Sequence, residues 1–145
     1  PEIDYLELFD EPLVVVLPVD HPLAHEKEIT AAQLDGVNFV STDPAYSGSL
    51  APIVKAWFPH ENSQPNIVQV ATNILVTMNL VGMGLGVTLI PGYMNNFNTG
   101  QVVFRPIAGN VPSIALLMAW KKGEMKPALR DFIAIVQERL ANVTA

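Results

Sequence analysis

The sequence contains no cysteine among its 145 residues. This absence excludes disulfide bonds, thiolate nucleophiles and zinc sites built on cysteine. A chain without cysteine is also compatible with a reducing compartment. We therefore expect a cytoplasmic protein whose fold is held by core packing alone.

The sequence also lacks a long uninterrupted apolar run. The most apolar stretch, residues 74–90, is broken by Thr77, Asn79 and three glycines, whereas a helix needs about 20 apolar residues to cross a bilayer. No membrane contact is predicted. The chain begins with Pro1, and no charged and then apolar leader precedes the first strand. We expect it to be a piece of a longer protein.

Basic residues are few and scattered. Eight Lys and Arg stand against 14 Asp and Glu, which gives a formal net charge of -6. Because DNA binding depends on neutralising phosphates with Lys and Arg, this chain itself is a poor candidate for contacting nucleic acid. Half of the residues are hydrophobic, so a sizeable core is expected and disorder is not.

Recognisable catalytic and metal-binding patterns are missing. His21 and His25 are four residues apart, but Pro22 lies between them, so they do not form a ligand pair on one helix face. No serine stands in a nucleophile-elbow pattern. The glycines of residues 82–86 follow a predicted helix and precede a strand, which is the reverse of a dinucleotide-binding loop. We expect no enzyme activity, no metal and no cofactor.

Apolar periodicity and the positions of proline and glycine predict an α/β fold. Short apolar runs predict strands at residues 11–18, 37–41, 67–70, 87–90, 102–107 and 114–120. Helical spacing predicts a short helix capped by Thr30, then helices over 49–58, from Thr72 or Asn73 to Val81, and over 127–142. Pro59 is expected to end the second helix, and residues 95–100 are expected to form a loop.

Strands that are almost continuously apolar and alternate with helices favour a largely parallel sheet with helices on both faces. In such a sheet, ligands bind beyond the carboxyl ends of the strands. Two loops at that edge, residues 41–49 and 70–73, place hydroxyl and amide groups at helix N-termini, which favour anions. Gly48 would let a ligand approach the backbone, and Tyr46 could lie against an aromatic ring.

A structural interpretation of these loops is equally open. Serine and threonine are ordinary helix caps, and loops containing proline, glycine and serine are ordinary turns. The residues alone do not decide between a ligand site and simple capping.

Five segments, in order along the chain, resemble the effector-binding domain of LysR-type transcriptional regulators. They are residues 11–18, 21–24, 81–91, 114–120 and 127–132. The resemblance implies a type II periplasmic-binding-protein-like fold with two α/β subdomains. Residues 11–112 would form the complete second subdomain, while residues 1–10 and 113–145 would be parts of the first.

The resemblance also implies a site and its partners. An effector, expected to be a small aromatic carboxylate of the phenylpropionate and cinnamate class, would bind in the cleft between the subdomains. Its contacts in this chain would come from Tyr46, Ser47, Gly48, Ser49, Thr72, Asn73, Pro91 and Tyr93. The protein would be an activator that forms homodimers or tetramers and contacts DNA only through a winged helix-turn-helix outside this chain.

Two alternatives remain at this point. The same fold would suit a solute-binding protein for a small organic acid, and it also carries dehydratases that act on prephenate-like acids. The sequence upstream of this chain would distinguish the regulator from the solute-binding protein. A helix-turn-helix there supports the regulator, and a secretory signal peptide opposes it.

Overall fold

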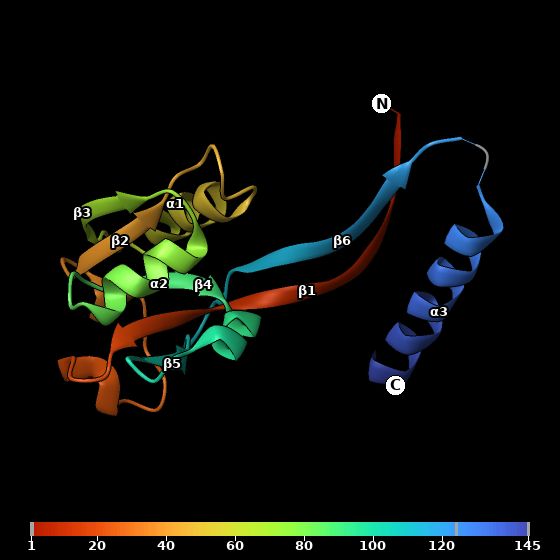
Figure 1. Ribbon diagram of the computed structural model, residues 1–145. Helices are drawn as coiled ribbons and strands as arrows, with labels where there is room; N and C mark the ends of the chain where they lie inside the picture. Colours follow the sequence, from red (N-terminus) through yellow and green to blue (C-terminus); the bar gives the residue numbers. More distant parts are fainter. Residues whose placement is uncertain (1, 124, 145) are drawn as a thin grey trace. The chain divides into compact units, whose positions relative to one another are not determined.

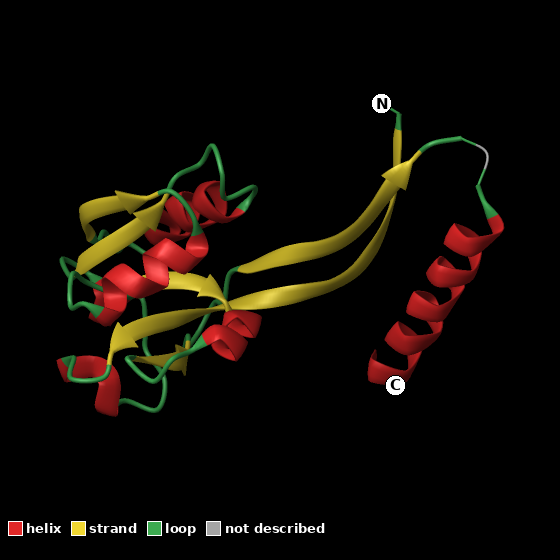
Figure 2. Ribbon diagram, in the orientation of Figure 1, coloured by secondary structure: helices red, strands yellow, loops and turns green. Residues whose placement is uncertain are grey.

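The computed structural model describes residues 2–123 and 125–144. Contacts within the chain divide it into two compact units, Glu11–Ile114 and the pair Pro1–Asp10 with Ala115–Ala145. Their assignment to the subdomains of a longer regulator stays a prediction. Figures 1 and 2 show the elements, which are β1 (Ile3–Pro18), η1 (Pro22–His25), η2 (Ala32–Leu34), β2 (Asn38–Thr42), α1 (Leu50–His60), β3 (Asn66–Ala71), α2 (Ile74–Gly82), β4 (Thr88–Pro91), η3 (Gly92–Phe97), β5 (Val102–Pro106), β6 (Ser113–Lys121) and α3 (Pro127–Thr144).

The α/β fold is as predicted, but the strands do not run in the predicted direction. The second half of β1 lies between β4 and β5 and is antiparallel to both. β2 and β3 pair in parallel, and a parallel bridge between Phe39 and Val87 joins β2 to the start of β4. The sheet arrangement is therefore mixed rather than largely parallel. Continuous apolar runs indicate burial on both faces of a strand, and antiparallel strands can be buried in the same way.

β1 is twice as long as the sequence pattern suggested, because it begins at Ile3 rather than at Glu11. Its first half shows alternating exposed and half-buried residues, and β6 pairs with β1 and has the same alternation. Such a period of two is typical of strands with one partly covered face. The backbone N–H of Lys122 continues this pairing by donating to the carbonyl of Glu2.

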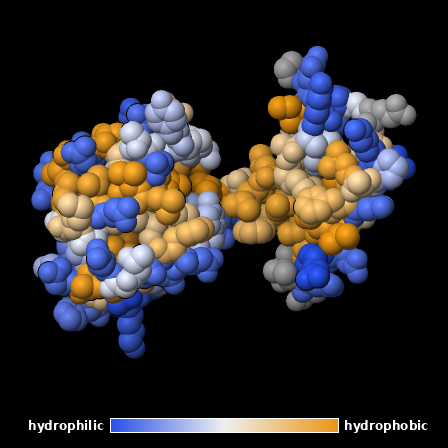
Figure 3. Space-filling model, in the orientation of Figure 1, coloured by the Kyte–Doolittle hydropathy of each residue, from blue (hydrophilic) through white to orange (hydrophobic). Residues whose placement is uncertain are grey.

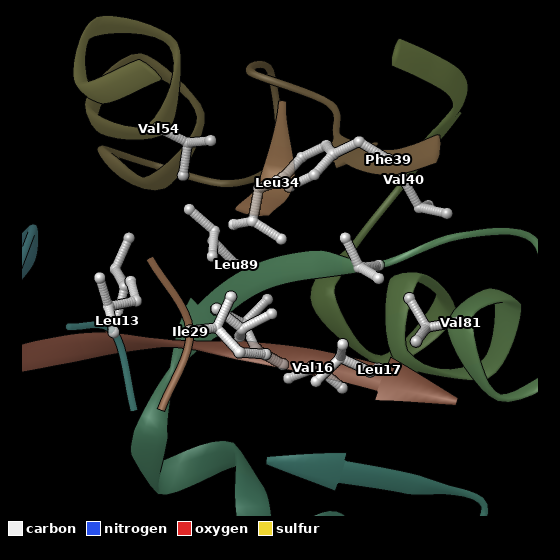
Figure 4. Packing of buried hydrophobic residues seen from close by; sticks show 14 of the residues in the cluster. Leu13, Val16, Leu17, Ile29, Leu34, Phe39, Val40, Val54, Val81 and Leu89 are labelled. Carbon is white, nitrogen blue, oxygen red and sulfur yellow. The ribbon is translucent and has the colours of Figure 1, made fainter. Parts of the chain in front are cut away.

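The core of the Glu11–Ile114 unit is built around β1, β2 and β4. Figure 4 shows Val54 of α1 directed toward Leu89 of β4, and Val40 of β2 on the side of Val81 of α2; all four belong to one buried apolar cluster. Helix α1 contributes Leu50, Val54, Trp57 and Phe58, a spacing that places them on one helix face. The edge-to-face contact of Phe39 with Phe58, at 5.4 Å between ring centroids, fixes α1 on β2.

β3 is an exception to the prediction of helices on both faces. Ile67 is 59% exposed and Val70 is 51% exposed, and Val68 is also exposed. The space-filling view shows such apolar residues, in orange, at the surface among polar ones (Figure 3). β3 is hydrogen-bonded to β2 alone among the described strands, so it is an edge strand with an apolar outer surface.

Two smaller expectations about helices are wrong. Pro59 lies inside α1, which continues to His60. A proline in the last turn removes only one helical hydrogen bond, so it does not force the helix to end before it. The expected loop at residues 95–100 overlaps η3, which extends to Phe97. The described part of the chain contains no helix with the length and apolar character needed to cross a bilayer.

The close approach of Gly86 to β2 gives a test of this packing. A Cβ at Gly86 would lie 2.4 Å from the carbonyl oxygen of Asn38, so Gly86→Ala must push the backbones apart. We expect a loss of about 1–3 kcal/mol in the free energy of unfolding, measured by urea denaturation.

Gly82→Ala is the control. Gly82 lies in helix α2, and a Cβ there would have the side-chain oxygen of Gln101 as its nearest neighbour, at 3.2 Å, rather than a backbone atom. That variant should be neutral or more stable by up to about 1 kcal/mol. Equal stability of the two variants would contradict the close approach at Gly86.

Candidate functional site

Three strands end at the same edge of the Glu11–Ile114 unit. Thr42 and Ala71 are paired at the ends of the parallel strands β2 and β3. The Val40 N–H donates to the Val87 carbonyl at 2.9 Å, which sets β4 parallel to β2 on its other side. The segments that follow, residues 43–49, 72–73 and 91–93, therefore leave from one edge, where sheets of this kind bind ligands.

The first of these segments is a tightly hydrogen-bonded loop. The carboxylate of Asp43 accepts from the Ala45 N–H at 2.8 Å, and its carbonyl accepts from the Tyr46 N–H at 3.1 Å. The Asp43 N–H donates to the Ala71 carbonyl at 2.8 Å, which ties the loop to the end of β3. Gly48 has φ +58°, a left-handed conformation that glycine adopts without a steric penalty. The loop thus holds a defined shape at the start of α1.

Neither serine of the loop acts as a helix cap. Ser49 occupies the N-cap position of α1, but its side chain makes no capping hydrogen bond. The Oγ of Ser47 is buried and has no hydrogen-bond partner among the described residues. Because most buried hydroxyls in proteins are hydrogen-bonded, an orphan hydroxyl calls for an explanation. The simple capping interpretation does not supply one for Ser47, and this favours a ligand-binding role.

In the second segment, residues 72–73, one polar side chain does cap a helix. Asn73, rather than Thr72, caps α2, because its side-chain oxygen accepts from the Val76 N–H at 2.9 Å. The amide NH₂ of Asn73 is left as a donor without a partner in the described part of the chain. Thr72 is exposed. A ligand at this helix end would therefore meet amide donors, and it would need to offer an acceptor.

The remaining predicted residues lie differently. Pro91 is buried at the end of β4 and paired with Leu13 of β1, so it can contribute shape but no hydrogen-bond donor. Tyr93 is 38% exposed, and Tyr46 is 73% exposed. Hydrogen bonds bring together the loops of Ser47 and Asn73, while Pro91 and Tyr93 share only the same strand edge with them.

Sequence reasoning missed a buried pair of hydroxyls behind the two loops. The Oγ1 atoms of Thr42 and Thr77 are 3.0 Å apart, and Thr77 also donates to the carbonyl of Asn73 at 2.9 Å. The available signal was a threonine on the inner face of an apolar helix, which the sequence analysis used only as a break in an apolar run.

His21 has a structural role in a turn. Its Nδ1 accepts from the Leu23 N–H at 3.1 Å and caps η1, and burial lowers its pKa against the opposing charge of Asp20. A ring nitrogen that accepts from the backbone serves the turn. Among the described residues, no group of three or more His, Cys, Asp and Glu side chains is arranged to hold a metal ion.

A sizeable hollow in the described part of the chain lies away from the predicted residues. It is a groove of about 680 Å³ between α1, β2 and β3, and its lining includes Phe39, Lys55, Phe58 and Ile67. Of the first loop it touches Pro44, but it reaches none of the eight predicted site residues. Its lining is mainly apolar and includes the cationic side chain of Lys55. Apart from the apolar pattern of β3, no sequence feature noted above indicates this groove.

Comparison with known proteins identifies the family. The family model described as "LysR substrate binding domain" matches residues 1–141. The chain belongs to this family.

Curated relatives fit this assignment. The chain is 97% identical over 145 residues to the Hca operon transcriptional activator HcaR of Escherichia coli (strain K12), covering all of this chain and 49% of that protein. It is 28% identical over 139 residues to the transcriptional regulator CatR of Pseudomonas putida, covering 96% of this chain and 48% of the relative. The chain thus spans about half the length of the curated relatives that it matches.

Solved structures share the fold. The effector-binding domain of QuiR in complex with shikimate aligns with a TM-score of 0.78 and 23% identity, covering 98% of this chain and 67% of that one. The BenM effector-binding domain with its effector benzoate aligns with a TM-score of 0.77 and 18% identity, covering 99% and 66%. The type II periplasmic-binding-protein-like fold that the sequence predicted is confirmed.

The orphan hydroxyl predicts an unusual response to mutation. Ser47→Ala removes a buried hydroxyl that has no partner, so the free energy of unfolding should stay within about 0.5 kcal/mol of the original or rise. Ser63→Ala is the matched control, because the buried Ser63 hydroxyl donates to the Ala31 carbonyl at 2.7 Å.

Urea denaturation should show a loss of about 1–3 kcal/mol for Ser63→Ala only. A comparable loss for Ser47→Ala would mean that the Ser47 hydroxyl has a partner within the protein.

Proposed function

We propose that this chain is the effector-sensing part of a LysR-type transcriptional activator. It binds a small aromatic carboxylate of the phenylpropionate and cinnamate class, and the binding energy controls the DNA contacts of a winged helix-turn-helix outside this chain. The assembled regulator is a homodimer or a homotetramer. The near identity to HcaR over the whole chain supports the activator assignment.

The observation that carries the ligand class is a pair of donors at the strand edge without a partner among the described residues, one of them buried and the other exposed. The buried Ser47 hydroxyl and the amide NH₂ of Asn73 come from two loops that hydrogen bonds join through Asp43 and Ala71. Each donor stands at the N-terminus of a helix, where the helix dipole adds about 0.3–1 kcal/mol in favour of an anion. Gly48, Ser49 and Thr72 flank these donors.

The ligands of two proteins with similar structures support an acidic ligand. BenM is described with benzoate and QuiR with shikimate, and both ligands are carboxylic acids. Aromatic side chains near the edge, Tyr46 and Tyr93, would pack against an aromatic body, and buried Pro91 would shape the floor.

The effector acts in this proposal by differential affinity. A ligand shifts a conformational equilibrium only as far as it binds one state better, at about 1.4 kcal/mol for each tenfold difference in affinity. The donors of this chain form one wall of the site, and the first subdomain of the longer protein supplies the other. Effector binding favours one subdomain arrangement and thereby changes the spacing of the DNA-binding heads.

The two alternatives are less well supported. A solute-binding protein does not fit a chain that is 97% identical to a transcriptional activator. An enzyme that acts on aromatic acids would need a free acid or base at the strand edge, and the carboxylate of the first loop, that of Asp43, already accepts from the Ala45 N–H.

Substitution of Asn73 separates ligand recognition from helix capping. Asn73→Asp keeps the oxygen that accepts from the Val76 N–H, and Asp caps helices as well as Asn does. The change replaces the amide donors with a carboxylate oxygen that repels an acidic ligand. Isothermal titration of the full-length protein with 3-phenylpropionate should show affinity at least about tenfold weaker, with an unchanged or higher melting temperature.

Asn73→Ser is the control, since it keeps a cap without placing a negative charge in the site. Its affinity for 3-phenylpropionate should lie between that of the original protein and that of Asn73→Asp. Unchanged affinity in Asn73→Asp would remove Asn73 from the site. Unchanged affinity in a protein carrying both Ser47→Ala and Ser49→Ala would show that the first loop is not part of the site.

A further inference from the structure

Three buried threonine hydroxyls lie close behind the strand edge. Thr42 is the last residue of β2, Thr77 is in the first half of α2 and Thr88 is the first residue of β4, and each is at most 4% exposed. Helix α2 packs on β2, and Figure 1 shows the two elements side by side. Buried hydroxyls cost free energy unless they are hydrogen-bonded, so the direction of each bond can be worked out.

The bonds of Thr77 can run in one direction only. Its hydroxyl donates to the carbonyl of Asn73 at 2.9 Å, because a carbonyl oxygen can only accept. A hydroxyl has a single proton, so Thr77 has none left for Thr42, whose Oγ1 is 3.0 Å away. Thr42 must therefore donate to Thr77. The result is a directed chain from the end of β2, through α2, to the backbone of Asn73.

This chain fixes the orientation of Asn73. The carbonyl of Asn73 accepts from both the N–H and the hydroxyl of Thr77, at 3.0 and 2.9 Å. Its side-chain oxygen accepts from the Val76 N–H. Each oxygen of Asn73 therefore already accepts a hydrogen bond within the chain, whereas the amide NH₂ makes none with the described residues and is free to meet a ligand.

We infer that Thr77 is a positioning residue, which holds Asn73 with its amide donors facing the site and couples that loop to the one that follows Thr42. The coupling sets the site for a ligand group that accepts hydrogen bonds, such as a carboxylate, and it selects against a donor such as an amine. This inference rests on the proposed function for its ligand, but the hydrogen-bond chain can be tested without one.

The chain offers a matched control for the test. Thr88 is also a buried threonine, and its hydroxyl donates to the carbonyl of Val40 at 2.8 Å without reaching Asn73. Thr77→Val and Thr88→Val each remove one buried hydroxyl and keep the side-chain shape. Both should lower the melting temperature, and Thr77→Val should do so more strongly because it also leaves the buried Thr42 hydroxyl without an acceptor. Thr88→Val thus measures the general effect of losing a buried hydroxyl, apart from any effect on the site.

Titration of full-length variants with 3-phenylpropionate gives the first readout. Thr77→Val should weaken binding at least about fivefold relative to Thr88→Val, and Thr77→Ser, which keeps the hydroxyl, should bind within about twofold of the original. Thr42→Val should resemble Thr77→Val. The inference is overturned if Thr77→Val and Thr88→Val bind equally well while the original protein binds normally.

Hydrogen exchange without ligand gives the second readout. Thr77→Val should speed exchange of the Val76 N–H, because the cap loses its fixed partner, whereas Thr88→Val should leave that amide unchanged. Failure of the original protein to bind 3-phenylpropionate would count against the proposed function, and the exchange rates would still decide whether Thr77 positions Asn73. Equal exchange in the two variants would overturn the positioning role.

Discussion

The structure of the larger unit depends on the contact between β2 and the segment 86–88. Val87 exchanges hydrogen bonds with β2, donating to the Asn38 carbonyl at 2.8 Å and accepting from the Val40 N–H at 2.9 Å. The Thr88 hydroxyl adds a bond to the Val40 carbonyl. Gly86 permits this approach, because any side chain there would meet the backbone of β2. This contact joins the β2–β3 pair to the sheet of β4, β1 and β5.

The same contact determines where a ligand can bind. By setting β4 parallel to β2, it brings the ends of three strands to one edge, where two helices begin. Each helix start carries a donor that the protein leaves unused, at Ser47 and at Asn73.

Much of the fold could be predicted from the sequence because its signals are local. The apolar runs and the cap expected at Thr72 or Asn73 each reflect a preference that acts over a few residues. Strand direction depends on partners distant in sequence, so the antiparallel position of β1 was missed. Ser47 was predicted as a site residue, yet its orphan hydroxyl and the bond between Thr42 and Thr77 emerge only in three dimensions.

The central claim is that the strand edge, and not the apolar groove beside β3, receives the carboxylate. A crystal structure of the full-length protein with 3-phenylpropionate tests it most directly. The ligand carboxylate should lie within about 3.2 Å of the Ser47 Oγ and the Asn73 amide nitrogen. A ligand seated instead between α1 and β3, with its carboxylate on Lys55, would contradict it.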